Sequence, residues 1–353
     1  MKRLLSFAAA FAIGLCTITA ASAEPKKEFN IAWTIYVGWM PWPYAAETGI
    51  VKKWADKYGI TINVTQINDY VESINQYTAG KFDGVTLTNM DALTIPAAGG
   101  VDTSAIIMGD FSNGNDGVVL KNAKILSDIK GRRINIVELS VSHYLLARGL
   151  ASVRLREKDI KTINTSDADI VAAFGAPATT AIVTWKPQLS EVLSAPNAQL
   201  VFDSSKIPGE ILDLMVVKTD VLNANPKLGK ALVGAWYETL ALMFKNDPAG
   251  QAAQTAMAKA SGTDLSGFGR QLATTHVFAT PADAYAFVTG DGVIKSMDSV
   301  RKFSFEHGIL GQGANSVDAV GIQFPAGKSL GDIRNLKMRF DSGVSKLAMD
   351  GKL

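Results

Sequence analysis

Carboxylate and aromatic side chains recur in this sequence directly after short apolar runs. The run "FNIAWTI" leads to Trp39 and Trp42, and the run "ITINVTQI" leads to Asp69 and Tyr70. Ionised carboxylates accept N–H hydrogen bonds, often in pairs, and aromatic rings offer a π face to flat or cationic groups. Such residues, if brought together, would form a pocket suited to N–H donors.

The apolar runs alternate with helical patterns, which is typical of βαβ units and largely parallel sheets. In open α/β sheets, ligands bind outside the carboxyl ends of the strands, beside helix N-termini. We therefore take polar and aromatic residues at strand ends as candidate binding residues. They are Trp39, Trp42, Tyr70, Asn89, Asp91, Asn113, Asp116, Glu138, Ser140, Ser142, His143 and Trp185.

Each candidate also has a purely structural interpretation. Asp69, Asn89 and Ser140 suit helix N-caps, a role that contributes about 1 kcal/mol. Asn113 and Asp116 suit a turn, and His143 suits the first turn of a helix. Trp42 and Trp185 suit packing positions with one wet edge. The functional interpretation therefore depends on the set and not on any single residue.

The elements that must position these residues can be placed from periodicity and turn signals. The expected strands are 29–35, 60–67, 82–87, 103–110, 134–139, 160–165, 180–185 and 211–218. The expected helices are 44–58, 70–79, one beginning near Asn89, 141–152, 167–174, 187–193, 226–245, 249–261, 265–273, 281–287 and 292–307. After residue 218 the pattern predicts an almost wholly helical region.

Signatures of enzymes and metal sites are weak. No G-x-S-x-G motif occurs, and "PAGKSLG" has Ile322 where a phosphate-binding loop needs glycine. The stretch "DFSNGND" has Asn115 where a calcium loop needs its turn glycine. The three histidines are scattered along the sequence without metal-ligand spacing. We expect no catalytic residue, no metal and no cofactor.

The first residues have the form of a secretory signal peptide, with Met1-Lys2-Arg3, an apolar stretch and Ala21-Ser22-Ala23. Cleavage after Ala23 would leave 330 residues without cysteine, because Cys16 is the only one. A lipid anchor is not expected, since Leu15 precedes that cysteine. The mature chain would carry 33 basic and 33 acidic residues. Such a neutral balance gives no support to a nucleic-acid partner.

The stretches "DFSNGNDGVVLK", "LSDIKGRRINIVELSVSHYLLARGL" and "TAIVTWKPQL" resemble the periplasmic solute-binding proteins of ABC importers in the nitrate, sulfonate and taurine group. That group includes proteins related to thiamine-precursor synthesis, and the resemblance spans about residues 29–245. "WTIYVGWMPWPYAAETG" and "NDYVESINQYTAGKFDGVTLTNMDAL" resemble a subgroup of urea-transport binding proteins found beside urea carboxylase, an enzyme class associated with guanidine.

The resemblance implies an α/β protein with the two-lobed periplasmic binding protein fold, type II with hinged lobes, and a helical C-terminal extension. Residues 24–112 and 213–353 would form lobe 1, and residues 113–212 lobe 2. The crossing segments would lie near 109–116 and 209–216. The implied partners are an ABC permease and its ATPase, and the implied state is a periplasmic monomer without membrane insertion after cleavage.

The acidic strand ends favour a guanidine- or urea-like ligand over an anion. At an effective dielectric near 20, a carboxylate 4 Å from an anion would repel it by roughly 4 kcal/mol. The alternatives are a binding protein for nitrate, a sulfonate or taurine, a thiamine-precursor enzyme on the same fold, and a periplasmic sensor subunit. An enzyme is disfavoured because the thiamine-precursor enzymes on this fold bear cysteines and are cytosolic. The mature chain would have no cysteine, and it follows an export signal. The sequence does not rank urea against guanidine.

Overall fold

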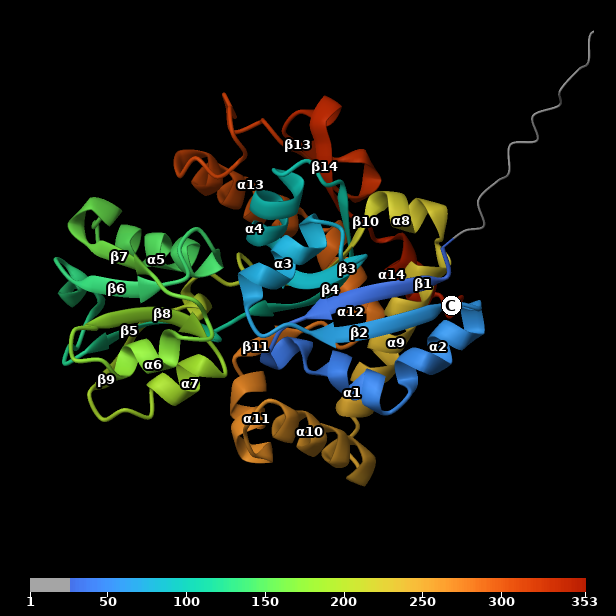
Figure 1. The fold of residues 1–353 in the computed structure, drawn as a ribbon, viewed down its shortest axis with the longest axis horizontal. Coiled ribbons are helices and arrows are strands. Elements are labelled where there is room, and N and C mark those ends of the chain that lie inside the picture. The colour runs from blue at the N-terminus through green and yellow to red at the C-terminus, as the bar shows by residue number, and fades with distance from the viewer. Residues whose placement is uncertain (1–25) are drawn as a thin grey trace, which may run out of the picture.

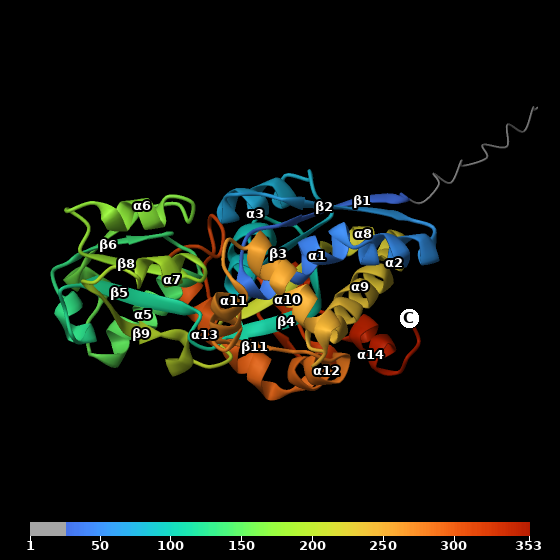
Figure 2. The same cartoon turned by 90° about the horizontal axis from the view of Figure 1, so that it is seen from below.

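The computed structural model describes residues 26–353, and the expected signal peptide lies outside them. Two β-sheets form separate lobes, each covered by helices (Figure 1, Figure 2). The larger, nine-stranded sheet defines lobe 1, and the five-stranded sheet defines lobe 2. The two-lobed fold expected from the sequence is confirmed.

Lobe 1 has the strand order β13-β12-β14-β4-β10-β3-β1-β2, with β11 paired to β4. Its strands are β1 Glu28–Trp33, β2 Thr61–Gln66, β3 Gly84–Thr88, β4 Thr103–Ser112, β10 Leu212–Lys218, β11 Thr275–Val277, β12 Gly321–Gln323, β13 Ser329–Leu330 and β14 Leu336–Phe340. Its helices are α1 Pro41–Glu47, α2 Ile50–Tyr58, α3 Tyr70–Thr78, α4 Asn89–Ala92, α8 Thr219–Ala224, α9 Lys227–Met243, α10 Pro248–Ala260, α11 Leu265–Leu272, α12 Pro281–Thr289, α13 Asp291–Glu306 and α14 Gly343–Met349.

Lobe 2 has the strand order β7-β6-β8-β5-β9. Its strands are β5 Asp116–Lys121, β6 Arg133–Ile136, β7 Lys161–Asn164, β8 Ala181–Trp185 and β9 Ala198–Asp203. Its helices are α5 Val141–Ser152, α6 Ile170–Gly175 and α7 Gln188–Val192. The chain passes from β4 into β5 and returns from β9 into β10, so both crossings lie beside these strands.

The expectation of largely parallel sheets is wrong for one strand next to the crossings in each lobe. Strand β10 runs antiparallel to both β3 and β4, and β5 runs antiparallel to both β8 and β9. These are the strands next to the crossings, where the chain enters one lobe from the other. Their reversed direction brings the amino ends of β5 and β10 to the edge where the parallel strands have their carboxyl ends.

Two further expectations need correction. The helix expected over 44–58 is two helices, because Gly49 has a left-handed backbone with φ of 78° and breaks it between α1 and α2. The region after residue 218 is not wholly helical, since it contributes β11 to β14. These strands are two to five residues long, too short for an alternating pattern to stand out. Strand β9 was also missed.

The core of lobe 1 includes a pair of tryptophans between α1 and α9. The rings of Trp42 and Trp236 lie 5.3 Å apart at 30°, and both side chains are buried. The "WMPWPY" stretch thus places the Trp42 indole against α9, and Trp39, three residues earlier, is buried as well. Trp42, a candidate binding residue, is a packing residue in this structure.

We expect Trp236→Ala to destabilise the protein by about 3–5 kcal/mol, because the substitution leaves a large cavity beside Trp42. The measurement is the free energy of unfolding by chemical denaturation. Ile333→Ala, at a side chain that is 66% exposed, is the control and should change stability by at most about 0.5 kcal/mol. A loss below 1 kcal/mol for Trp236→Ala would contradict this role of the pair.

Candidate functional site

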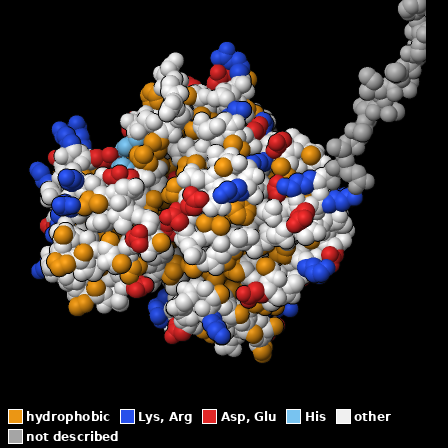
Figure 3. Space-filling view, viewed as in Figure 1, with side chains coloured by type: hydrophobic (Ala, Val, Ile, Leu, Met, Phe, Trp, Pro, Cys, Tyr) orange, Lys and Arg blue, Asp and Glu red, His pale blue; other side chains and the backbone are white. Residues whose placement is uncertain are grey.

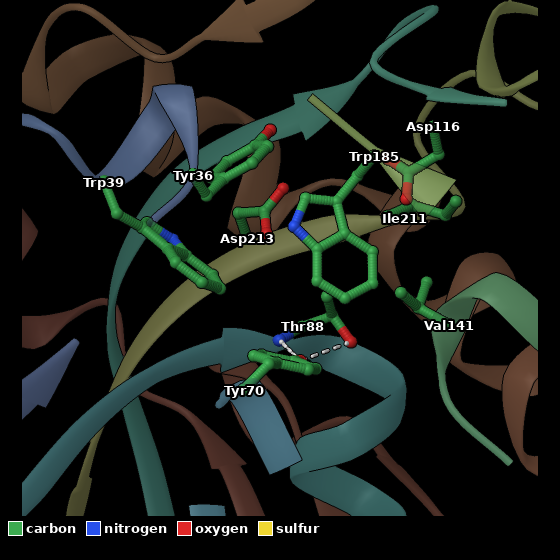
Figure 4. Close-up of a pocket in the computed structure, with 9 residues that line it drawn as sticks. All are labelled: Tyr36, Trp39, Tyr70, Thr88, Asp116, Val141, Trp185, Ile211 and Asp213. Carbon is green, nitrogen blue, oxygen red and sulfur yellow. Dashed lines mark hydrogen bonds between the residues drawn. The ribbon is translucent and has the colours of Figure 1, made fainter. Parts of the chain in front are cut away.

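A small cavity lies between the two lobes. The space between its walls, which includes parts open to solvent, is about 300 Å³. Figure 4 shows aromatic rings on several sides of this space, with the Asp213 carboxylate between Trp39 and Trp185 and that of Asp116 on the far side of Trp185. The lining residues are Tyr36, Trp39, Tyr70, Thr88, Asp116, Val141, Trp185, Ile211 and Asp213.

Aromatic rings from both lobes form the walls. Tyr70, at the start of α3, stacks with Trp39 at 6.0 Å and meets Trp185 edge-on at 5.5 Å. Trp39 also meets Tyr36 edge-on at 5.0 Å. Trp185 ends strand β8 of lobe 2, whereas the other three rings belong to lobe 1. A flat solute between them would therefore contact both lobes.

Two aspartates of lobe 1 face each other behind the cavity. Asp110 on β4 is the register partner of Asp213 on the antiparallel strand β10, and both are buried. The Tyr36 hydroxyl donates to Asp110 Oδ1 at 2.8 Å, while Asp110 Oδ2 has no hydrogen-bond donor among the described residues. A Cβ atom at Gly38 would lie 2.2 Å from that Oδ2 atom, so the loop needs glycine at this position.

A third carboxylate, Asp116, approaches from lobe 2. It accepts a hydrogen bond of 2.5 Å from the Ser112 hydroxyl, and the Ser204 hydroxyl lies 2.6 Å from that of Ser112. Asp116 is 4% exposed and lines the cavity beside Trp185 and Asp213. The three acids come from β4, β5 and β10, the strands next to the two lobe crossings.

Burial dominates the electrostatics of these acids. It raises the pKa of Asp110 to about 7 and that of Asp116 to about 6. The pKa of Asp213 is raised well above its usual range by burial, by the negative charge of Asp110 and by that of Asp116. Neither lysine nor arginine belongs to the cavity lining.

Asp91 lies one layer behind the aromatic wall. It accepts hydrogen bonds from the Tyr70 hydroxyl at 2.7 Å and from the Thr88 hydroxyl at 2.8 Å. Thr88 also caps α4, since its side chain accepts from the Asp91 backbone N–H. Burial raises the pKa of Asp91 to about 6, with the two hydroxyl donors acting in the opposite direction. Asp91 therefore fixes the Tyr70 ring and does not line the cavity.

The NMT1/THI5-like sequence profile matches residues 43–249, more than half of the chain. The chain belongs to the NMT1/THI5-like family. The matched range includes the acids of β4, β5 and β10 as well as Tyr70 and Trp185, whereas Tyr36 and Trp39 precede it. No curated protein matches this NMT1/THI5-like sequence significantly.

Solved structures resemble this NMT1/THI5-like protein in fold. The alkanesulfonate-binding protein SsuA from Xanthomonas axonopodis pv. citri, bound to MOPS, has a TM-score of 0.66 at 18% identity, covering 82% of this chain and 96% of that one. The periplasmic aliphatic sulphonate-binding protein SsuA of Escherichia coli has a TM-score of 0.64 at 17% identity, covering 80% and 94%. The periplasmic nitrate-binding protein NrtA from Synechocystis PCC 6803 has a TM-score of 0.57 at 13% identity, covering 93% and 99%.

The structure brings together four of the candidates chosen from the sequence. Trp39, Tyr70, Asp116 and Trp185 all line the cavity of this NMT1/THI5-like protein. Asp91 supports them from behind. Their role in binding stays a prediction.

Other candidates have contacts elsewhere. The Asn89 side-chain N–H donates to Glu210 O, and its side-chain oxygen accepts from Leu212 N, at 3.1 Å each. These hydrogen bonds connect α4 to the crossing segment. Asn113 is an exposed turn residue whose backbone N–H donates to Thr274 O. Glu138 is half-buried after β6 and does not line the cavity.

The candidates at the start of α5 are structural in their contacts. Ser140 caps α5 by accepting from Ser142 N at 3.2 Å. Asp69 caps α3 by accepting from Glu72 N at 2.8 Å. The Ser142 hydroxyl is buried without a partner among residues 26–353, and the next residue towards the N-terminus, Val141, lines the cavity.

The candidates chosen from the sequence do not include Tyr36, Thr88, Val141, Ile211 and Asp213 of the lining, or Asp110 behind it. An aspartate inside an apolar strand was the available signal, in "TSAIIMGD" and in "ILDLMVVK". The search covered only the carboxyl ends of strands, whereas Asp213 lies near the amino end of the antiparallel strand β10.

The histidines are not all scattered in space. His143 of α5 and His307, which follows α13, have ring centroids 5.3 Å apart and share the carboxylate of Glu157. His307 Nε2 lies 2.6 Å from Glu157 Oε1, and His143 Nε2 lies 3.4 Å from Oε2. The contacts with the two histidines, that with His143 first, lower the pKa of Glu157 to about 2.

The hydrogen bond of the His143 ring fits a structural contact with Glu157 better than metal ligation. Leu139 N donates to His143 Nδ1 at 3.1 Å, which places the proton of the neutral ring on Nε2, the atom that faces Glu157. A metal-ligating histidine usually donates from its other nitrogen. The cluster joins lobe 2 to the C-terminal part of lobe 1, where Figure 3 shows histidine beside acidic side chains at the surface.

Direct contacts between the lobes also occur beside the cavity. The Tyr70 backbone N–H donates to Asp167 Oδ1 at 3.1 Å, and Lys186 Nζ donates to the Thr274 hydroxyl at 2.8 Å. Burial raises the pKa of Asp167 to about 6. The structure thus has its lobes in contact around the cavity.

Within residues 26–353, no helix combines the length and apolarity needed to cross a membrane.

We expect the ligand-free protein to become more stable as the pH falls from 8 to 5. The pKa values of Asp91, Asp110, Asp116 and Asp167 are raised in the folded state, so the folded protein binds more protons than the unfolded chain in this window. Each extra proton contributes about 1.4 kcal/mol per pH unit. Denaturant unfolding at several pH values measures the slope.

Asp167→Asn is the matched variant, because it removes one of these titrating groups at the lobe contact. Its slope should be shallower than that of the unaltered protein between pH 5 and pH 7. A flat profile, or stability that falls from pH 8 to pH 5 in the unaltered protein, would contradict the raised pKa values.

Proposed function

We propose that this protein is the periplasmic substrate-binding subunit of an ABC importer and captures a small guanidine- or urea-like solute. Family membership, the two-lobed fold and the cavity between the lobes support a solute-binding role. The structural neighbours are named as sulfonate- and nitrate-binding proteins, which supports a periplasmic solute-binding protein as the general class of function. A cleaved signal peptide, residues 1–23, would export the chain.

The observation that carries the ligand class is the charge of the cavity. Asp213 and Asp116 line it, Asp110 lies behind it, and its lining contains no basic side chain. A nitrate or sulfonate at this position would meet like charge, with repulsion of roughly 4 kcal/mol from each ionised carboxylate at 4 Å and an effective dielectric near 20. An N–H-rich solute would instead donate to the same oxygens.

The aromatic rings suit a flat solute. Tyr70, Trp39 and Trp185 present apolar faces to the cavity, and a cation over such a face gains about 0.5–2 kcal/mol. Because the rings come from both lobes, a bound solute favours the closed arrangement over an open one. Lobe 1 would comprise 24–112 and 213–353 and lobe 2 would comprise 113–212, with bending near 109–116 and 209–216.

One observation favours urea as a second candidate. The buried Trp39 Nε1 atom has no hydrogen-bond acceptor among residues 26–353. A urea carbonyl would supply one, whereas guanidinium carries only donors. In either case the protein would bind its solute without chemistry, need no cofactor, act as a monomer and present its closed form to a permease and ATPase.

A binding screen of the mature protein tests this proposal. We expect guanidinium chloride or urea, at millimolar concentrations far below denaturing ones, to raise the melting temperature by preferential binding to the folded state. At a concentration 100 times Kd the stabilisation would be about 2.7 kcal/mol. Trp185→Ala should weaken binding by about 0.5–2 kcal/mol, measured by calorimetry.

Glu138→Gln is the matched control, because it removes a carboxylate of lobe 2 that does not line the cavity. It should leave the affinity unchanged. Saturable binding of nitrate or taurine, with no response to guanidinium, urea or small amines, would overturn the proposed ligand class.

A further inference from the structure

We propose that the Asp110–Asp213 pair is a proton-exchange site that selects a monocation, so that the bound solute is a guanidinium-type cation whose binding releases a proton. The inference rests on the proposed function and names the charge of its ligand. It also assigns roles to two residues, one lining the cavity and one behind it.

The geometry of the pair leaves one buried oxygen, Asp110 Oδ2, without a donor among the described residues. Asp110 and Asp213 are directly opposite each other on β4 and β10, and they are 0% and 3% exposed. Tyr36 donates to one oxygen of Asp110, but Asp110 Oδ2 has no partner among the described residues. Two ionised carboxylates are acceptors only, so such a pair needs a shared proton or a cation between or beside its members.

The surrounding groups do not supply that cation. The charged or titratable side chains that act on the pair are Tyr36 beside β1, Asp116 on β5 and the two aspartates themselves. On the neighbouring strand β11, His276 is exposed and stacks on Phe111. Asp91 acts on Asp116 from α4. The local environment is therefore acidic on every side that touches the pair.

Without a ligand, a proton fills the missing role. Burial raises the pKa of both carboxyls, that of Asp110 to about 7, and the charge of Asp110 raises the pKa of Asp213 further, while a hydrogen bond with Asp213 favours the ionised form of Asp110. The pair thus retains a proton near neutral pH. That proton satisfies the pair but leaves less negative charge on Asp213, the member that faces the cavity (Figure 4).

A cation that donates N–H groups to Asp213 makes the proton unnecessary. One carboxyl O–H bond breaks, the proton passes to the buffer, and the carboxylate pairs with the cation. The net charge of the site is unchanged in this exchange, and no oxidant or reductant is needed. Neutral urea brings no charge to replace the proton, so it would bind without releasing one.

The unpartnered Trp39 Nε1–H favours urea over a cation, because urea has a carbonyl oxygen that can accept its hydrogen bond. A single indole N–H contributes one hydrogen bond, whose net value is about 0.5–1.5 kcal/mol. Buried charges without a counter-charge cost several times more. The acids therefore decide the charge of the ligand.

Isothermal titration calorimetry with guanidinium chloride and with urea, in phosphate and in Tris buffer at pH 7, tests the exchange. We expect the guanidinium enthalpy to differ between buffers by an amount that corresponds to release of up to one proton. The association constant should rise with pH from 5 to 8, approaching tenfold per pH unit where a full proton is exchanged. Urea should bind at least tenfold more weakly, with no buffer dependence.

Asp110→Asn distinguishes the exchange from simple attraction by acids. It leaves Asp213 in the cavity but removes the partner charge, so proton release at pH 7 should fall by at least half while guanidinium still binds. Circular dichroism and the melting temperature check that the variant folds. Glu138→Gln should retain the full proton release.

Guanidinium binding that is independent of pH and buffer, or urea binding as tight as guanidinium binding, would overturn this inference and leave the proposed function intact. Unchanged proton release in folded Asp110→Asn would also overturn it. Failure of guanidinium, urea and small amines to bind at all would overturn the proposed function and the inference together.

Discussion

Buried carboxyl groups without a matching cation are the constraint on which the site depends. Asp110, Asp116 and Asp213 lie on β4, β5 and β10, where the chain passes between the lobes. Burial of these carboxyl groups disfavours their ionised form. A cation buried beside them would favour that form again. The proposed function therefore links charge in the cavity to the arrangement of the lobes, because a cation held by these acids would also touch rings of both lobes.

The remaining parts of the site hold this arrangement in place. Asp91 and Thr88 fix the Tyr70 hydroxyl, while Ser112 and Ser204 orient Asp116. The Asn89 side chain connects α4 to the segment that returns from lobe 2 into β10. The aromatic wall and the acid of β10 are therefore held by connected elements. Farther out, Glu157 with His143 and His307 joins lobe 2 to the region after α13.

The sequence predicts the βα order and four residues of the cavity lining, because apolar runs, glycine stops and N-caps are local signals. Asp213 could not be found from strand ends, since β10 runs antiparallel and the pairing of Asp213 with Asp110 joins positions 103 residues apart. Trp42 and Trp39 are three residues apart, yet Trp42 contacts α9 and Trp39 lines the cavity. Tertiary packing decides which tryptophan takes which place. The meeting of His143 and His307 likewise depends on how α13 lies against lobe 2.

The most direct measurement is a crystal structure of the mature protein grown with a guanidinium salt at low ionic strength. The expected result is a planar guanidinium among Trp39, Tyr70 and Trp185, with N–H groups within 3.2 Å of Asp213 and Asp116 oxygens. An anion in that position, or a guanidinium bound only elsewhere while the cavity holds water, would contradict a cation-selective site between the lobes.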